Sequence, residues 1–134
     1  MLIGNNPLNE KPEWFKKNIE IIPQCKNVEV ENKKIKYFIW GDESLPKLIF
    51  LHGFNAHSYW WSHIAPFFNA KYCVVALDFS GMGESEHREE YSQAMYSKEI
   101  KAVVDEMECT KPICLAHSMG CLLYTSPSPR DQAK

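Results

Sequence analysis

The chain has 134 residues, which is enough for one small domain. Hydrophobic residues make up 45% and charged residues 24%, so the composition is that of a folded globular protein and excludes disorder throughout. The formal charge is −2 with no basic stripe, which argues against a nucleic-acid partner. No apolar run reaches the roughly 18 residues of a membrane span. From the polar start of the sequence we expect no secretory signal peptide.

The five cysteines are scattered along the sequence and form no Cys-x-x-Cys pair. An odd number without a disulfide framework is typical of reduced thiols, so we expect a cytoplasmic protein. None of their spacings matches a zinc site, and nothing in the sequence implies a metal or an organic cofactor.

The amino-terminal part of the sequence predicts a short helix followed by a hairpin. Apolar residues within 11–22 recur at near-helical spacing after Pro12, and Pro23 ends the pattern. Within 27–41, apolar and charged residues alternate as they do in two antiparallel strands. We place the turn at Asn32-Lys33, because asparagine tolerates a positive φ.

Three short apolar runs predict buried strands of a parallel sheet. These runs lie at 47–51, 72–77 and 112–116. Helical patterns separate them, one at 60–68 that Pro66 interrupts and one at 92–107 with Ser92 as its N-cap. The alternation predicts an α/β fold with a mostly parallel sheet and an antiparallel hairpin at its amino-terminal side.

A serine with small neighbours follows the third apolar run. Ser118 has Ala116 two residues before it and Gly120 two residues after it, which is the pattern of a nucleophile elbow. In such a turn the serine has a strained backbone, and larger neighbours at those two positions would collide. Function gathers at the carboxyl ends of parallel strands, so we expect Ser118 to be a catalytic nucleophile.

The loop after the first apolar run begins with His52 and Gly53. A His-Gly pair at this place typically supplies a backbone N–H to an oxyanion hole. We therefore predict that the N–H groups of Phe54 and Met119 form that hole. We expect His52 to be structural and to stabilise its own loop, although a general base is the alternative role for such a histidine.

The loop after the second run contains Asp78, Gly81 and Gly83. Its two glycines suggest a dinucleotide fingerprint, but the third glycine of that motif would fall at Glu86, so the motif fails. We expect a structural loop instead.

Together, the segments LHGF, LDFSGMGES and AHSMG resemble the α/β-hydrolase fold family in its esterase- and lipase-like branch. The resemblance covers residues 27–120 and implies the amino-terminal half of that fold, preceded by an extension at 1–26. It also implies a small-molecule substrate of the ester type or a related carbonyl compound. Epoxide hydrolases and haloalkane dehalogenases of this fold use Asp as nucleophile, so Ser118 argues against both. A non-catalytic binding protein of the same fold is the alternative.

The resemblance also implies an acid and a histidine after the serine, yet no histidine follows Ser118. We expect no intact catalytic triad among the earlier histidines. The segment CLLYTSPSPRD, which opens residues 121–134, resembles the in-frame translation of a sequencing adapter. We therefore expect a non-native tail, without regular structure from Pro127 on, and a truncated hydrolase whose chain as written is inactive.

Overall fold

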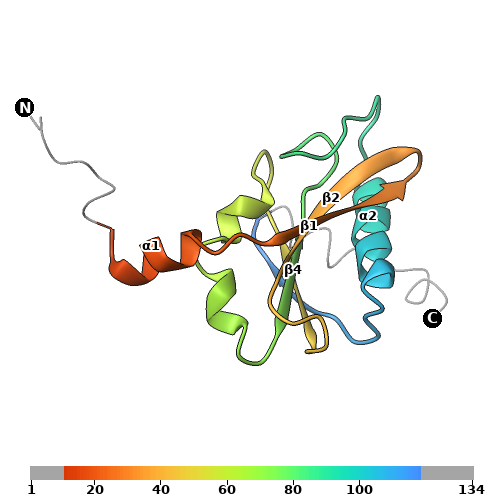
Figure 1. Ribbon diagram of the computed structural model, residues 1–134. Coiled ribbons are helices and arrows are strands. Elements are labelled where there is room, and N and C mark those ends of the chain that lie inside the picture. Colours follow the sequence, from red (N-terminus) through yellow and green to blue (C-terminus); the bar gives the residue numbers. More distant parts are fainter. Residues whose placement is uncertain (1–10, 119–134) are drawn as a thin grey trace, which may run out of the picture.

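A computed structural model describes residues 11–118 of the protein. Within these residues, strands form one sheet in the order β1-β2-β4-β3-β5 (Figure 1). The strands are β1 (Gln24–Val30), β2 (Lys33–Trp40), β3 (Lys47–Leu51), β4 (Cys73–Leu77) and β5 (Ile113–Ala116). The helices are α1 (Glu13–Ile19), α2 (Gln93–Glu106) and the two 3₁₀ helices η1 (Ser58–Trp61) and η2 (Ala65–Phe68).

Parallel pairing dominates the carboxyl-terminal side of the sheet. Strand β3 pairs in parallel with both β4 and β5, whereas β2 is antiparallel to β1 and to β4. The predicted α/β fold, with a mostly parallel sheet and an amino-terminal antiparallel hairpin, is therefore confirmed.

The hairpin turn lies one residue earlier than predicted. Val30 pairs with Lys33, so the two turn residues are Glu31 and Asn32. Both have a positive φ, 47° at Glu31 and 64° at Asn32. A two-residue turn with two positive φ values matches the right-handed twist of its strands, which explains why this register is adopted.

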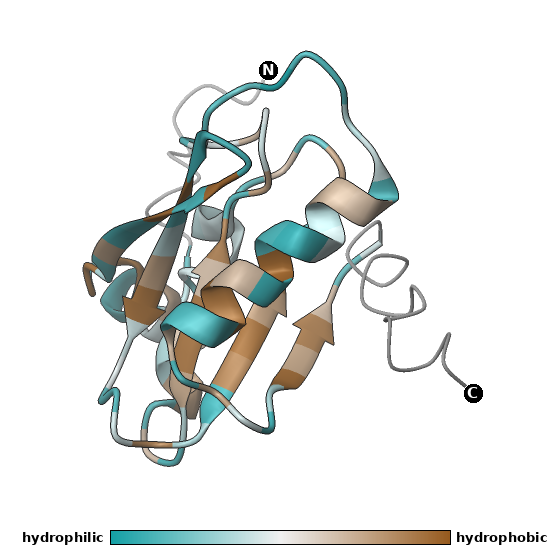
Figure 2. Ribbon diagram, turned by 90° about the vertical axis from the view of Figure 1, so that its right-hand side faces the viewer, coloured by the Kyte–Doolittle hydropathy of each residue, from teal (hydrophilic) through white to brown (hydrophobic). Residues whose placement is uncertain are grey.

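The sheet is covered on both faces by helices. Figure 2 shows α2 lying across one face, with the apolar strands behind it. Val103 and Met107 of α2 belong to the core on that face, together with Ile49 of β3. The 3₁₀ helices cover the other face, where Trp61 and Ala65 pack with the side chains of β3 and β4. Strands β3 and β4 are therefore buried on both sides, as their continuous apolar sequences predict.

The helices differ from the predictions mainly in length and type. Helix α1 ends at Ile19, earlier than the expected pattern over 11–22. The segment 60–68 does not form one helix: it contains the end of η1, a turn at 62–64 and η2, because Pro66 has no N–H with which to continue a helix. The predicted N-cap of α2 is confirmed, since the Ser92 hydroxyl accepts a hydrogen bond from the Met95 N–H at 3.0 Å.

Strand β5 departs from the expectation of burial on both faces. Ile113 and Leu115 are 50% and 40% exposed. Within the described residues, β5 pairs only with β3 and lies at the edge of the sheet. Cys114 and Ala116 point to the other face and pack against the core beneath α2.

Some of the predictions concern residues outside the described part of the chain. Met119, Gly120 and the expected tail at 121–134 all lie there. Among residues 11–118, no helix combines the length and the apolar character that crossing a bilayer requires.

The contrast between β3 and β5 predicts different costs for the same substitution. Ile49→Val removes a methylene from a side chain with no exposure and should lower the free energy of unfolding by about 0.5–1.5 kcal/mol. Ile113→Val at the half-exposed edge should change it by less than about 0.5 kcal/mol. Urea denaturation of both variants measures the difference, and equal costs would contradict the arrangement of the sheet.

Candidate active site

The three parallel strands end side by side at one edge of the sheet. Leu51, the last residue of β3, pairs with Leu77 at the end of β4 and with Ala116 at the end of β5. The loops that begin at His52, Asp78 and His117 therefore start next to one another. These are the three segments that the sequence analysis singled out.

Ser118 lies just beyond the end of β5 and is exposed. The N–H of the preceding His117 donates to the Leu51 carbonyl at 3.1 Å, which carries the pairing of β5 with β3 one residue further. The backbone of Ser118 then turns to a φ of 54°. This left-handed region costs a non-glycine residue about 1–3 kcal/mol, and an elbow that presents a serine hydroxyl requires it.

Gly53 brings the loop after β3 directly against Ser118. A Cβ atom at Gly53 would lie 3.2 Å from the His117 Nδ1 and 3.3 Å from the Ser118 Cβ. Such contacts are tighter than nine in ten Cβ contacts in proteins. The absence of a side chain at Gly53 therefore allows the close approach between this loop and the elbow.

Phe54 follows in a tight turn. The Ala56 N–H donates to the Gly53 carbonyl at 3.2 Å, and Asn55 has a φ of 58°. The Phe54 side chain is 76% exposed, so its predicted role depends on its backbone alone. None of the hydrogen bonds within residues 11–118 uses the Phe54 N–H, which leaves this donor available in that part of the chain. The predicted second donor, Met119, lies outside the described residues.

His52 is buried and connects two of the loops. The Phe79 N–H donates to its Nε2 at 3.1 Å, so Nε2 carries no proton. The protonated Nδ1 then donates to the Gly53 carbonyl at 2.7 Å. Burial lowers the pKa of His52, while the hydrogen bond to Gly53 acts in the opposite direction. His52 thus stabilises its own loop as a neutral ring, as the sequence analysis expected.

Asp78 makes contacts that the sequence analysis missed. It is 1% exposed, and its two carboxylate oxygens accept N–H groups from two different segments. Oδ1 accepts from Ser58 at 2.7 Å, and Oδ2 accepts from Glu84 at 2.9 Å. The one feature of the sequence that could have indicated these contacts is the position of Asp78 directly after a buried strand, where an unpaired charge is costly.

A buried ion pair lies behind the same loop. Arg88 Nε is 3.1 Å from Glu99 Oε2, and the Glu99 side chain has no exposure. Glu99 also accepts the Ser80 N–H at 2.8 Å and the Ser80 hydroxyl at 2.6 Å. Arg88 reaches the hairpin through a bond of 2.7 Å to the Val30 carbonyl. The sequence signal was a glutamate on the apolar face of the predicted helix, among residues with core spacing.

Within residues 11–118, no hydrogen bond joins a histidine ring to the Ser118 hydroxyl. The ring of His117 lies beside Trp60, with 6.2 Å between ring centroids. His63 packs against Phe15 at 5.5 Å, and His52 is occupied by its two hydrogen bonds. The expectation of no intact triad among the earlier histidines stays a prediction.

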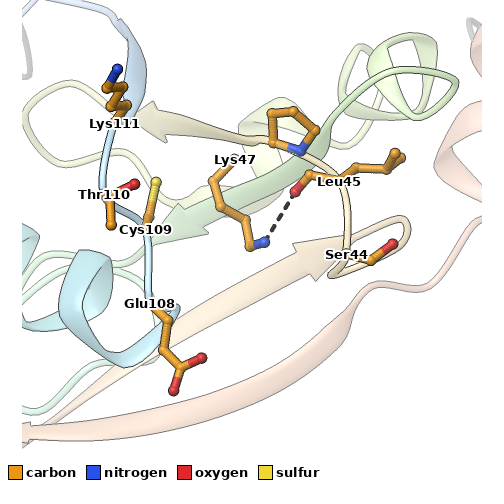
Figure 3. Close-up of a pocket in the computed structure, with 8 residues that line it drawn as sticks. Ser44, Leu45, Lys47, Glu108, Cys109, Thr110 and Lys111 are labelled. Carbon is orange, nitrogen blue, oxygen red and sulfur yellow. Dashed lines mark hydrogen bonds between the residues drawn. The ribbon is translucent and has the colours of Figure 1, made fainter.

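A hollow of about 280 Å³ lies at the opposite edge of the sheet (Figure 3). Its walls are the loops before β3 and β5, including Leu45, Lys47 and Cys109. Lys47 Nζ donates to the Leu45 carbonyl there at 3.0 Å. The hollow contains none of the candidate active-site residues, so it plays no part in the site.

Comparison with known proteins gives one family and several relatives. A family model described as the alpha/beta hydrolase fold matches residues 46–126. Epoxide hydrolase 4 of Mus musculus is 32% identical over 93 residues, which cover 67% of this chain and 26% of that protein. A serine hydrolase-like protein of Mus musculus is 30% identical over 87 residues, covering 61% and 27%. Among solved structures, a thioesterase domain from the curacin biosynthetic pathway has a TM-score of 0.75 and 29% identity, covering 79% and 39%.

The chain matches only part of each of these proteins. The chain spans between 26% and 39% of the length of these three proteins. The range that the family model matches, 46–126, includes β3, β4 and β5 and the beginnings of the three loops described above.

The buried neutral His52 predicts a loss of stability in acid. The unfolded chain takes up a proton near the ordinary histidine pKa of about 6.5, while the folded chain resists protonation because its pKa is lowered. The free energy of unfolding should therefore be constant above that pH and fall as the pH drops below it. Urea denaturation over this range is the measurement.

The matched control for this effect is the exposed His87, which is not among the groups that shift the His52 pKa. A His87→Gln chain should keep the whole acid dependence, whereas His52→Gln should lower stability at neutral pH and flatten the dependence near pH 6.5. The same dependence in both variants would show that His52 is not its source.

Proposed function

Because the chain belongs to the α/β-hydrolase fold family, we propose that Ser118 is the nucleophile of a hydrolase that acts on ester-type or related carbonyl substrates. The observation that carries the proposal is the placement of Ser118. It has a φ of 54° at the end of a parallel strand, and Gly53 lies against it. A strained serine beside a loop with an available N–H is what acyl transfer requires.

The chemistry follows from this geometry. The Ser118 Oγ attacks the carbonyl carbon of the substrate, and a general base takes its proton. The carbonyl oxygen becomes an oxyanion, which accepts hydrogen bonds from the Phe54 and Met119 N–H groups. Collapse of this intermediate breaks the bond from the carbonyl carbon to the alkoxide, which takes the proton back from the base and leaves as the alcohol, while the acyl group stays on Ser118. Water then attacks the acyl carbon, which frees the acid and restores the serine. None of these steps calls for a metal or an organic cofactor.

The described residues show no general base for this scheme. No histidine follows Ser118 in the sequence, and none of the earlier ones bonds to it within the described residues. We propose that the base and its orienting acid belong to a longer natural protein, of which residues 27–120 are the amino-terminal half of the catalytic domain. Residues 121–134 are then a non-native tail, and the reduced cysteines suit a cytoplasmic location.

A second candidate activity is epoxide hydrolysis, which the name of the first mouse relative suggests. Epoxide hydrolases of this fold use Asp as nucleophile, and this chain has Ser118 at that position. A serine ester intermediate suits acyl transfer, so the residue favours the carbonyl substrate. The alternative to an enzyme is a non-catalytic binding protein of the same fold.

An activated phosphonofluoridate, added together with imidazole as an external general base, tests the nucleophile although the chain shows no base of its own. The Ser118 oxygen displaces fluoride from phosphorus and becomes a phosphonate ester, and the serine proton passes to imidazole. We expect mass spectrometry to find the adduct on the peptide that contains Ser118 and to find none in Ser118→Ala.

The exposed Ser44, at the opposite edge of the sheet, is the matched control. A Ser44→Ala chain should be labelled at the wild-type rate. Equal labelling of Ser44 and Ser118, or none at Ser118, would contradict the proposed role.

Turnover of an ordinary ester should be absent from the chain as written. Removing a member of a catalytic triad typically costs several powers of ten in rate, and within residues 11–118 no histidine is bonded to Ser118. Hydrolysis of p-nitrophenyl acetate by the purified chain should equal that of Ser118→Ala. A soluble monomer with serine-dependent turnover of about 1–10³ per second would overturn the truncation proposal.

A further inference from the structure

We propose that Asp78 is a positioning residue that holds the loop carrying the Phe54 N–H against the Ser118 elbow. The inference rests on the proposed function, because the loop matters for catalysis only if Phe54 is an oxyanion donor. It extends that function to a residue that touches neither the substrate nor Ser118.

The first support is where Asp78 binds. Its Oδ1 accepts the Ser58 N–H at 2.7 Å across 20 residues of chain. Ser58 is the first residue of η1, so this bond fixes the point at which the loop 52–57 enters the helix. The bond thus joins the end of the loop, at Ser58, to Asp78 directly after β4.

The start of the same loop, at His52, is held by Phe79, the residue that follows Asp78 after β4. The Phe79 N–H donates to the His52 Nε2 at 3.1 Å, and the two rings pack with centroids 4.9 Å apart. Asp78 and Phe79 thus hold both ends of a six-residue loop whose middle carries the Phe54 N–H. With both ends fixed, the middle has little freedom to move.

The carboxylate is suited to this task because backbone donors satisfy it. No salt bridge within residues 11–118 includes Asp78. Its second oxygen accepts the Glu84 N–H at 2.9 Å. Gly83 makes that approach possible, since a Cβ there would lie 2.3 Å from Asp78 Oδ2. An asparagine has only one acceptor oxygen, so it leaves one of the two N–H groups opposite its own NH₂.

Position matters strongly for an oxyanion donor. A donor acts only when it lies about 3 Å from the oxygen, and its loss typically costs about 10²–10³ in rate. If the bond to Asp78 is lost, the loop is held only at His52, and the Phe54 N–H lies less often at hydrogen-bond distance from the oxyanion. Ser118 itself is unchanged. Asp78 therefore acts through Phe54 and should affect the reactivity of Ser118.

Two pairs of variants test this. Asp78→Asn removes one acceptor, and Asp42→Asn is its control, because Asp42 accepts the Ser44 N–H at 2.8 Å in a loop at the other edge. Ser58→Pro removes the donor. Proline is favoured at the first position of a helix, and His57 already has the extended ψ of 169° that a following proline prefers. Glu13→Pro makes the same change at the start of α1.

The buried Ser58 hydroxyl has no hydrogen-bond partner in the described residues, so the proline removes no side-chain bond. We expect Asp78→Asn and Ser58→Pro to slow phosphonofluoridate labelling of Ser118 by about tenfold or more. Asp42→Asn and Glu13→Pro should leave it unchanged. Amide hydrogen exchange of residues 53–57 should rise by about tenfold in the first pair only.

The outcomes separate this inference from the proposed function. Unchanged labelling and unchanged loop exchange in folded Asp78→Asn and Ser58→Pro would overturn the inference and leave Ser118 as nucleophile. If wild-type Ser118 does not react, the proposed function fails, and exchange in the loop still decides whether Asp78 holds it. If neither variant folds, the wild-type Ser58 amide decides, because rapid exchange there would contradict its buried bond to Asp78.

Discussion

The parallel pairing of β3 with both β4 and β5 is the constraint on which the rest of the structure depends. It brings Leu51, Leu77 and Ala116 to one edge of the sheet in a fixed register. Three loops that are distant in sequence begin there side by side. The central strands are buried on both faces, so their ends are fixed by packing, and precise loop contacts become possible.

Most of the fold could be predicted from the sequence because its signals are local. Continuous apolar runs predicted β3 and β4, and a serine N-cap with an apolar helix face predicted α2. The turn at Glu31 and Asn32 was placed one residue late, since strand twist selects a turn that residue preferences alone do not determine. The exposure of Ile113 was missed because an apolar run does not reveal how many neighbours its strand has.

The candidate site could be predicted in part. The spacing of Gly53 and Ser118 indicated which loops would meet, and the structure places them in contact. The buried carboxylates of Asp78 and Glu99 were not predicted as site features. Asp78 is stabilised by backbone N–H groups and Glu99 by an ion pair with Arg88, and such partners become visible only once distant segments are folded together.

The most direct measurement of the central claim is a nuclear Overhauser spectrum of the chain itself. The account requires Gly53 to lie against Ser118, because a Cβ atom at Gly53 would be 3.3 Å from the Ser118 Cβ. It predicts a strong cross-peak between the Gly53 α-protons and the Ser118 β-protons. A folded chain that has the cross-peaks between β3 and β4 but lacks this one would contradict it.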